Sequence, residues 1–126
     1  MLSAPRLLVT GSRSWTDRKV IRDALAQWWN ENGRNPDAVL ISGACPTGAD
    51  AIAESLWRQN GLTVERHPAD WNRYGNRAGP IRNRQMVHSN PDAVVAFIVD
   101  GSRGATGCVN EARKLGLPVT VYIASH

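Results

Sequence analysis

The chain has 126 residues, of which 42% are hydrophobic and 21% are charged. A chain of this length forms one domain that buries roughly two-thirds of its surface, and no apolar stretch approaches the ~20 residues of a membrane span. Residues 1–6 also lack the hydrophobic core of a signal peptide. We therefore expect a single cytoplasmic domain over residues 1–126, with no membrane partner.

The composition gives two further expectations. The formal net charge is +4 and 13 of the 15 basic residues are arginine, which favours anionic partners, although a bias toward arginine explains it equally well. The two cysteines, Cys45 and Cys108, are too few and too far apart for a zinc pattern or a disulfide framework. We expect no metal ion and no cofactor.

Apolar runs rich in β-branched residues alternate along the chain with helical patterns. Thr16 is the expected N-cap of the first helix, Gly61 the expected stop of the second, and residues 67–75 form an expected long loop. The strict alternation predicts a three-layer α/β domain with a five-stranded parallel sheet in the order 3-2-1-4-5. We expect strands at 7–10, 38–42, 62–66, 93–99 and 119–123, and helices at 17–30, 50–60, 80–89 and 106–115.

Three of the expected strands end in glycine and small polar residues directly before a helix. We call residues 11–13 (Gly11, Ser12, Arg13) the first glycine turn, residues 42–48 the second and residues 101–104 the third. Glycine lets the backbone approach a ligand, and the helix that follows presents free N–H groups that suit an anionic oxygen. Because parallel strands bring their carboxyl ends to one edge, the three turns predict a nucleotide or phosphosugar site in one crevice.

Two familiar nucleotide-binding motifs are absent from these turns. The first turn does not read G-x-G-x-x-G, and the second strand ends in Ser42-Gly43 where a dinucleotide-binding fold would place an acid. The second turn has the glycine spacing of a Walker loop, but Ala49 and Asp50 follow it instead of lysine and Ser/Thr. Neither an NAD dehydrogenase nor an NTPase is expected.

Several side chains near the turns have a functional and a structural interpretation. Arg13 either clamps a phosphate or faces solvent, and Trp15 either stacks on a base or lies in the core. Asp50 accepts ribose hydroxyls or favours the positive end of its helix. Trp71 supplies a stacking surface or folds over its own loop.

Arginines gather in and beside the expected loops, where their forked guanidinium groups suit phosphate; a solvated basic rim is the alternative. Two of them, Arg82 and Arg84, lie about 200° apart around a helix, so we expect only one to reach the pocket. The group comprises Arg13, Arg73, Arg77, Arg82, Arg84 and Arg103.

The segment from Asp70 to Met86, together with the three turns, resembles the YspA-related branch of the SLOG superfamily. These are Rossmann-like domains related to the lonely-guy phosphoribohydrolases, and the resemblance covers essentially the whole chain. It implies a Rossmann-like fold and a nucleotide-derived small-molecule partner, phosphoribosyl or ADP-ribose-like. The ligand-binding residues that it and the turns indicate are Gly11, Ser12, Arg13, Trp15, Ser42, Gly43, Thr47, Gly48, Asp50, Trp71, Arg82, Asn83, Gly101, Ser102, Arg103, Gly104 and Thr106.

The resemblance implies either an enzyme or a binding domain. The lonely-guy enzymes cleave the N-glycosidic bond of nucleoside monophosphates with an arginine, matched here by Arg82, and a glutamate, whose position holds Val109. Glu111 lies two residues further on, about 200° around the helix. We therefore expect a domain that senses or sequesters a nucleotide. The alternative is a hydrolase that uses Arg82 with Asp50 or Asp70 as its acid; Asp100 is expected to cap a turn.

Two partners beyond the small molecule are considered. Nucleic-acid binding ranks third, because the basic residues cluster around turns suited to one compact anion. The lonely-guy relatives pair through helix packing, so the resemblance implies a homodimer. Trp28, Trp29 and Trp57 offer apolar surface for such a contact, or are buried within one subunit.

Overall fold

The computed structural model describes residues 4–99 and 102–124, in which strands and helices alternate. Among these residues, no helix combines the length and the apolar character needed to cross a bilayer. The elements are β1 (Arg6–Gly11), α1 (Arg18–Glu31), β2 (Val39–Ser42), α2 (Gly48–Gln59), β3 (Thr63–Arg66), α3 (Trp71–Tyr74), the 3₁₀ turn η1 (Gly75–Arg77), α4 (Ala78–Val87), β4 (Ala93–Val99), α5 (Arg103–Lys114) and β5 (Val119–Ala124).

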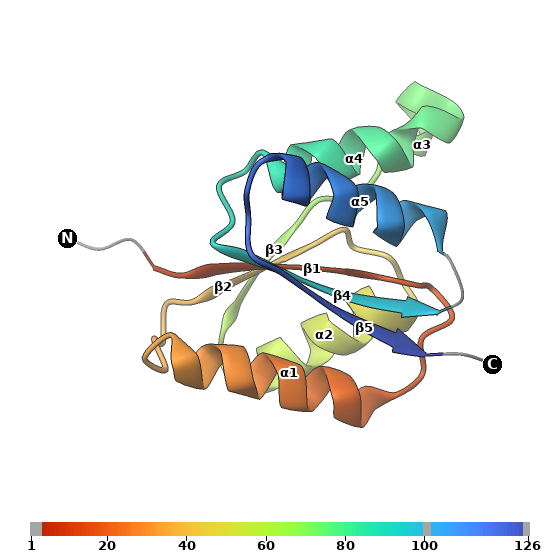
Figure 1. Ribbon diagram of the computed structural model, residues 1–126. Coiled ribbons are helices and arrows are strands. Elements are labelled where there is room, and N and C mark those ends of the chain that lie inside the picture. The colour runs from red at the N-terminus through yellow and green to blue at the C-terminus, as the bar shows by residue number, and fades with distance from the viewer. Residues whose placement is uncertain (1–3, 100–101, 125–126) are drawn as a thin grey trace.

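The five strands form one parallel sheet in the order β3-β2-β1-β4-β5, as the sequence predicts. Helices α1 and α2 cover one face of the sheet, and α4 and α5 cover the other (Figure 1). The chain moves outward from β1 to β3 on one side and then returns to place β4 against the other side of β1. This reversal leaves a crevice beyond the carboxyl ends of β1 and β4, where open α/β sheets bind ligands.

The core lies on both faces of the sheet because strand side chains alternate. Leu7 and Val9 of β1 pack toward α1 and α2, whereas Leu8 packs with Met86 of α4 and Cys108 of α5. Both faces of β1 and β4 are therefore covered, which explains why these strands read as continuous apolar runs.

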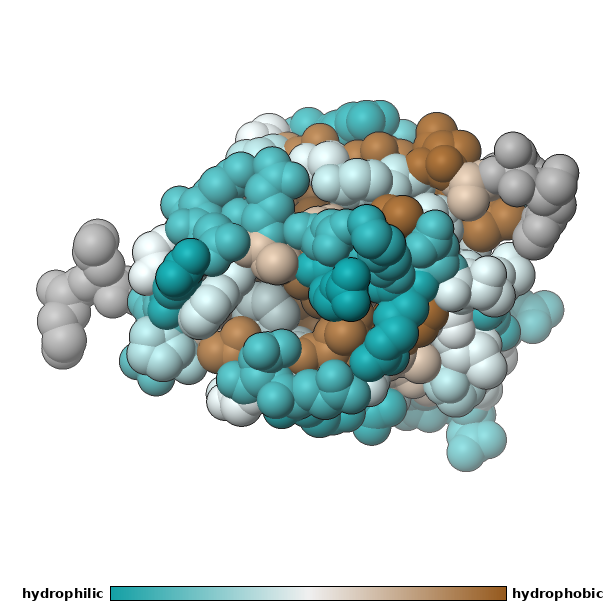
Figure 2. Space-filling model, turned by 90° about the horizontal axis from the view of Figure 1, so that it is seen from below, coloured by the Kyte–Doolittle hydropathy of each residue, from teal (hydrophilic) through white to brown (hydrophobic). Residues whose placement is uncertain are grey.

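The tryptophans of α1 and α2 belong to this core. Trp28 and Trp57 are buried and pack against each other, with ring centroids 6.3 Å apart, and the half-buried Trp29 donates its indole N–H to Asn35. They therefore provide little exposed apolar surface for a second subunit. Seen from below, the layer of α1 and α2 presents mostly hydrophilic side chains (Figure 2). Those exposed on α1 include Arg18, Lys19, Arg22, Asp23, Gln27, Asn30 and Glu31.

The predicted starts of three helices are wrong by two or three residues. Helix α2 begins at Gly48, α4 at Ala78 and α5 at Arg103, because glycine and proline are tolerated in a first turn, whose N–H groups need no helical acceptor. The predicted cap of α1 is also wrong: Asp17, not Thr16, accepts the Val20 N–H, at 3.2 Å.

The sequence also predicts a loop over residues 67–75 and the end of the second helix at Gly61, and the structure describes both. The expected loop over residues 67–75 contains the short helix α3, whose first turn is capped by Asp70 through the Arg73 N–H at 3.1 Å. Gly61 follows α2 with φ of +73°, which confirms it as the stop of that helix.

We expect Gly11→Ala to destabilise the protein by about 1–3 kcal/mol, because the added methyl group has no room. A Cβ at Gly11 would lie 2.4 Å from the Cβ of Ala49 and 2.5 Å from the backbone oxygen of Phe97. Urea unfolding measures the effect. The matched control is Gly107→Ala in α5, where a Cβ meets nothing within 4 Å and helix propensity predicts a gain of about 0.5–1 kcal/mol. Equal effects of the two substitutions would contradict the close approach at Gly11.

Candidate functional site

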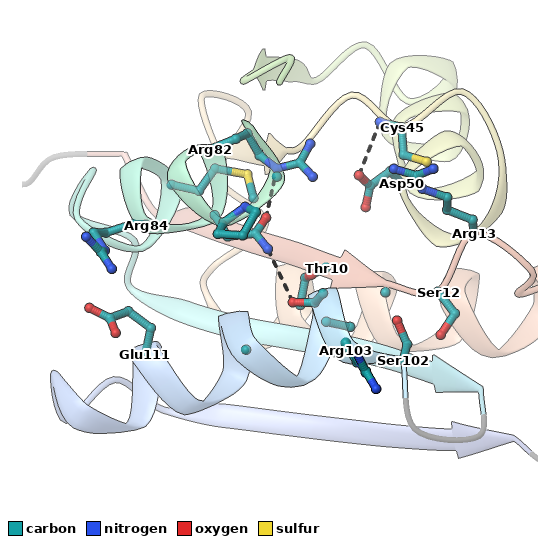
Figure 3. A pocket seen from close by; sticks show the side chains of 18 of the residues that line it. Thr10, Ser12, Arg13, Cys45, Asp50, Arg82, Arg84, Ser102, Arg103 and Glu111 are labelled. Carbon is teal, nitrogen blue, oxygen red and sulfur yellow. Dashed lines mark hydrogen bonds between the residues drawn. The ribbon is translucent and has the colours of Figure 1, made fainter. Parts of the chain in front are cut away.

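A cleft of about 750 Å³ lies at the carboxyl edge of β1 and β4 and runs between α4 and α5 (Figure 3). This volume is in the range that holds a small organic ligand. The predicted site residues that line it are Gly11, Ser12, Arg13, Asp50, Trp71, Arg82, Asn83, Ser102, Arg103 and Gly104. The structure thus brings residues of the first and third glycine turns together with Asp50 and Arg82.

The other predicted residues are not among those lining the cleft. Gly101 lies outside the described residues, as does Asp100. Thr47 and Thr106 are exposed away from the cleft lining, and Asp70 caps α3. Those that line no part of the cleft are Trp15, Ser42, Gly43, Thr47, Gly48, Asp70 and Thr106.

Trp15 occupies the core, which is the structural interpretation of this residue. Its side chain is 3% exposed and its ring meets the edge of Phe97 with centroids 5.4 Å apart. The indole N–H donates to the backbone oxygen of Asp17 at 2.9 Å, so both the apolar body and the polar tip are satisfied internally.

The second glycine turn bonds to the protein itself. The Ser42 hydroxyl donates to the buried carboxylate of Glu54 at 2.6 Å and accepts the Ala44 N–H at 3.1 Å. The Ala49 N–H, in the first turn of α2, donates to the backbone oxygen of Ser12 at 3.1 Å. These groups are therefore already paired, and the turn contributes Cys45 and Asp50 to the cleft in place of an open ring of N–H donors.

The first glycine turn joins the ends of β1 and β4. The Ser12 N–H donates to Phe97, and the Ser12 hydroxyl accepts the Val99 N–H, each at 2.8 Å. With these groups occupied, the turn presents the exposed side chain of Arg13 to the cleft. The Arg13 guanidinium carbon lies 5.9 Å from the ring centre of Trp71, which is 49% exposed.

Arg82 of α4 is held by hydrogen bonds on two sides. Its Nη1 donates to the backbone oxygen of Gly43, and its Nε donates to Oδ1 of Asn83 at 2.7 Å. Asn83 in turn donates to the backbone oxygen of Gly104 at 3.2 Å. Gly43 leaves room for this arginine, because a Cβ at that position would lie 2.7 Å from Arg82 Nη1 and the guanidinium would have to move. The resulting chain of contacts links the second turn, α4 and the start of α5.

Asp50 is a buried carboxylate beside this arginine. The residue is 7% exposed, and its Oδ2 accepts the Cys45 N–H at 3.3 Å. Burial raises the pKa of Asp50 to about 6, although the Cys45 hydrogen bond and the charges of Arg82 and Arg13 act in the opposite direction. A carboxyl group that titrates near neutral pH in a cleft is typical of functional sites.

The far end of the cleft combines charges of both signs. Arg84 and Glu111 both line it and face each other from α4 and α5 (Figure 3). The expectation that only one of Arg82 and Arg84 would reach the pocket is therefore wrong, because the cleft extends along the groove between the helices. His88 lies 3.1 Å from Glu111, and this hydrogen bond lowers the pKa of Glu111.

The position that holds glutamate in the lonely-guy enzymes holds a core residue in this chain. Val109 is buried and packs with Ala96 and Ile98 of β4 and with Ala105 of α5. The sequence predicts that Glu111 points elsewhere around the helix, and the structure places it at the far end of the cleft.

The start of α5 forms the wall opposite Arg82. Ser102, Gly104 and Ala105 line the cleft, and Ser102 makes no side-chain hydrogen bond to cap the helix. The N–H groups of a first helical turn have no acceptor within the helix and carry its positive dipole end. This wall therefore suits an anionic oxygen. Within residues 4–99 and 102–124, no group of three His, Cys, Asp or Glu side chains is placed to hold a metal ion.

The comparisons with known proteins identify the family of this chain. The profile of the YspA, cpYpsA-related SLOG family matches residues 5–74. The chain belongs to this family. It is also 42% identical over 119 residues to the gene 61 protein of Mycobacterium phage D29, covering 90% of this chain and 93% of the phage protein. No solved structure shows a significant match. The match to the family profile ends within α3, so the arginines of α4 lie beyond it.

Sequence reasoning did not single out several cleft residues as ligand-binding. Gly79 and Gly107 line the cleft because a residue without a side chain leaves space there. Gly79 lies in the segment that carries the family resemblance, whereas no local motif marks Gly107. Thr10 directly precedes the first glycine turn and Cys45 lies within the second, so their positions in the sequence could have indicated them. The cleft residues absent from the prediction are Thr10, Ser14, Cys45, Gly79, Pro80, Arg84, Met86, Val99, Ala105, Gly107 and Glu111.

We expect Asp50→Asn to stabilise the protein above pH 6 by roughly 1–3 kcal/mol, because burial of the charged carboxylate opposes folding there. The asparagine oxygen still accepts the Cys45 N–H. The gain should vanish below pH 3.8, the ordinary pKa of an aspartate, because Asp50 is then protonated in both states, and it should grow as the pH rises to about 6. Urea unfolding across this range measures it. Asp23→Asn is the control, because the Lys19 hydrogen bond lowers the pKa of Asp23; equal behaviour of the two variants would contradict the prediction.

Proposed function

We propose that this domain binds a nucleotide or a nucleotide-derived ligand, phosphoribosyl or ADP-ribose-like, and that it senses or sequesters that ligand. The observation that carries the proposal is the cleft at the carboxyl edge of the sheet, where arginines from three segments meet the open first turn of α5. Family membership supports the same ligand class.

The phosphate is assigned to the region between Arg82 and the start of α5. The Arg82 guanidinium is oriented by hydrogen bonds on one side, and the first turn of α5, which has no side-chain cap from Ser102, lines the cleft on the other. A fork-shaped cation and a helix N-terminus each bind phosphate oxygens. Arg13 and Arg103 add positive charge at the mouth.

The base is assigned to Trp71. Almost half of this side chain is exposed, although it is a large aromatic residue, and it lines the cleft beside the Arg13 guanidinium. Aromatic stacking on a base contributes about 1–3 kcal/mol. Two other large aromatic residues near the sheet edge, Trp15 and Phe97, are buried in the core and do not line the cleft.

Calorimetry with a panel of nucleoside monophosphates and ADP-ribose tests this function. We expect Arg82→Ala and Arg13→Ala each to lower affinity roughly ten- to hundredfold, since each removes a charge-assisted contact worth about 1.5–3 kcal/mol. The matched control is Arg22→Ala on α1, which lies beyond the opposite face of the sheet. Binding that is equal in the wild type and both cleft variants would show that the pocket is assigned incorrectly.

N-glycosidic hydrolysis is the second candidate function, and Asp50 is the observation that favours it. Its pKa of about 6 would allow it to accept a proton from the attacking water or to stabilise positive charge at C1′ of the ribose as the base departs. Against this, Val109 is buried at the position of the glutamate in the lonely-guy enzymes. Asp70, the other acid considered, caps α3 and does not line the cleft.

We expect little or no release of free base from nucleoside monophosphates, even where they bind. Chromatography of the products after prolonged incubation measures it, with Asp70→Asn as a control that keeps a capping side chain on α3. Cleavage that is lost in Asp50→Asn and in Arg82→Ala but retained in Asp70→Asn would establish a hydrolase. Cleavage that all three variants retain would indicate a contaminating enzyme.

A further inference from the structure

One oxygen of the Asp50 carboxyl has no protein hydrogen-bond donor among the described residues. Oδ2 accepts the Cys45 N–H, whereas no donor in the described parts of the chain reaches Oδ1. The residue is more than nine-tenths buried and its exposed remainder lines the cleft. The other cleft carboxylate, Glu111, is paired with His88. Oδ1 is not one of the fully buried unpaired polar atoms of the described residues, so it opens onto the cleft, where a ligand donor can reach it.

The neighbours of Asp50 restrict the chemistry of that donor. A Cβ at Gly43 would lie 2.7 Å from Arg82 Nη1 and 3.1 Å from Asp50 Oδ2, so the guanidinium and the carboxylate flank the same glycine. Arg13 also faces Asp50, and the two arginines disfavour a cationic ammonium group there. A phosphate group is anionic and mostly deprotonated at neutral pH, so it is a poor donor to a carboxylate. A hydroxyl group fits, because it donates to the carboxylate and accepts from a guanidinium.

We propose that Asp50 accepts hydrogen bonds from the hydroxyl groups of the ligand's ribose, so that the cleft selects ribonucleotides over deoxyribonucleotides. This inference rests on the nucleotide function proposed above. Asp50 lies in the first turn of α2, which is held by the Ala49–Ser12 hydrogen bond, so the carboxylate has a fixed position. Pairs of ribose hydroxyls are bound by carboxylates in other parallel-sheet nucleotide sites for the same reason.

The experiment compares the four ribonucleoside 5′-monophosphates with their 2′-deoxy and 3′-deoxy forms by calorimetry. For the wild type, removal of the hydroxyl that Asp50 binds should weaken affinity roughly ten- to hundredfold, as expected when a hydrogen bond to a charged group is lost. In Asp50→Asn the ratio of ribonucleotide to deoxynucleotide affinity should fall toward one, because the amide is a weaker acceptor. Asp23→Asn, on the exposed side of α1, should keep the ratio of the wild type.

Each possible result decides between the two proposals. Ribonucleotides and both deoxy forms that bind the wild type equally would overturn the role of Asp50 and leave nucleotide binding intact. A preference for ribonucleotides that persists in Asp50→Asn would also overturn it. If neither the monophosphates nor ADP-ribose bind the wild type, the proposed nucleotide function fails and this inference fails with it. The comparison within the wild type does not depend on how the variant folds.

Discussion

The hydrogen bonds of Ser12 join the end of β1 to the end of β4 and to the start of α2, and this junction places the first glycine turn and Asp50 at the cleft. Ser12 bonds to Phe97 and Val99 on one side and to Ala49 on the other, while Gly11 provides the space for this approach. These bonds fix α2, and with it Asp50, relative to the two central strands. The first glycine turn therefore acts mainly as a structural joint, and only Arg13 extends from it into the cleft.

The topology could be predicted because it depends on patterns that extend over many residues. Continuous apolar runs at β1 and β4 indicate strands covered on both faces, and the helical patterns between strands require parallel pairing with crossovers. The convergence of the glycine turns follows from that topology. Helix starts were less predictable, because Arg103 and Gly104 are compatible with either a loop or a first helical turn.

The candidate site could be predicted where residues adjoin the strand ends, and at Trp71, Arg82 and Asn83, which lie in the segment that carries the family resemblance. Arg13, Asp50 and Ser102 belong to the first group, and all three line the cleft. Whether a side chain such as Trp15 or Ser42 faces the cleft depends on partners far away in the chain, Phe97 and Glu54, which no local pattern shows. The same holds for Arg84, whose place in the lining follows from the path of the groove between α4 and α5.

The two buried carboxylates of α2, Glu54 and Asp50, differ in how many hydrogen-bond donors surround them. Glu54 is as deeply buried as Asp50, but it contacts Ser42, Arg58 and Arg66 and needs no ligand. Asp50 has one N–H donor and an arginine that bonds to Gly43 and Asn83 instead. A fold under selection for stability alone would favour an uncharged side chain at that position. The proposed ligand would supply a hydrogen-bond donor to this poorly paired carboxylate, in a cleft that Arg13, Arg82, Arg84 and Arg103 also line.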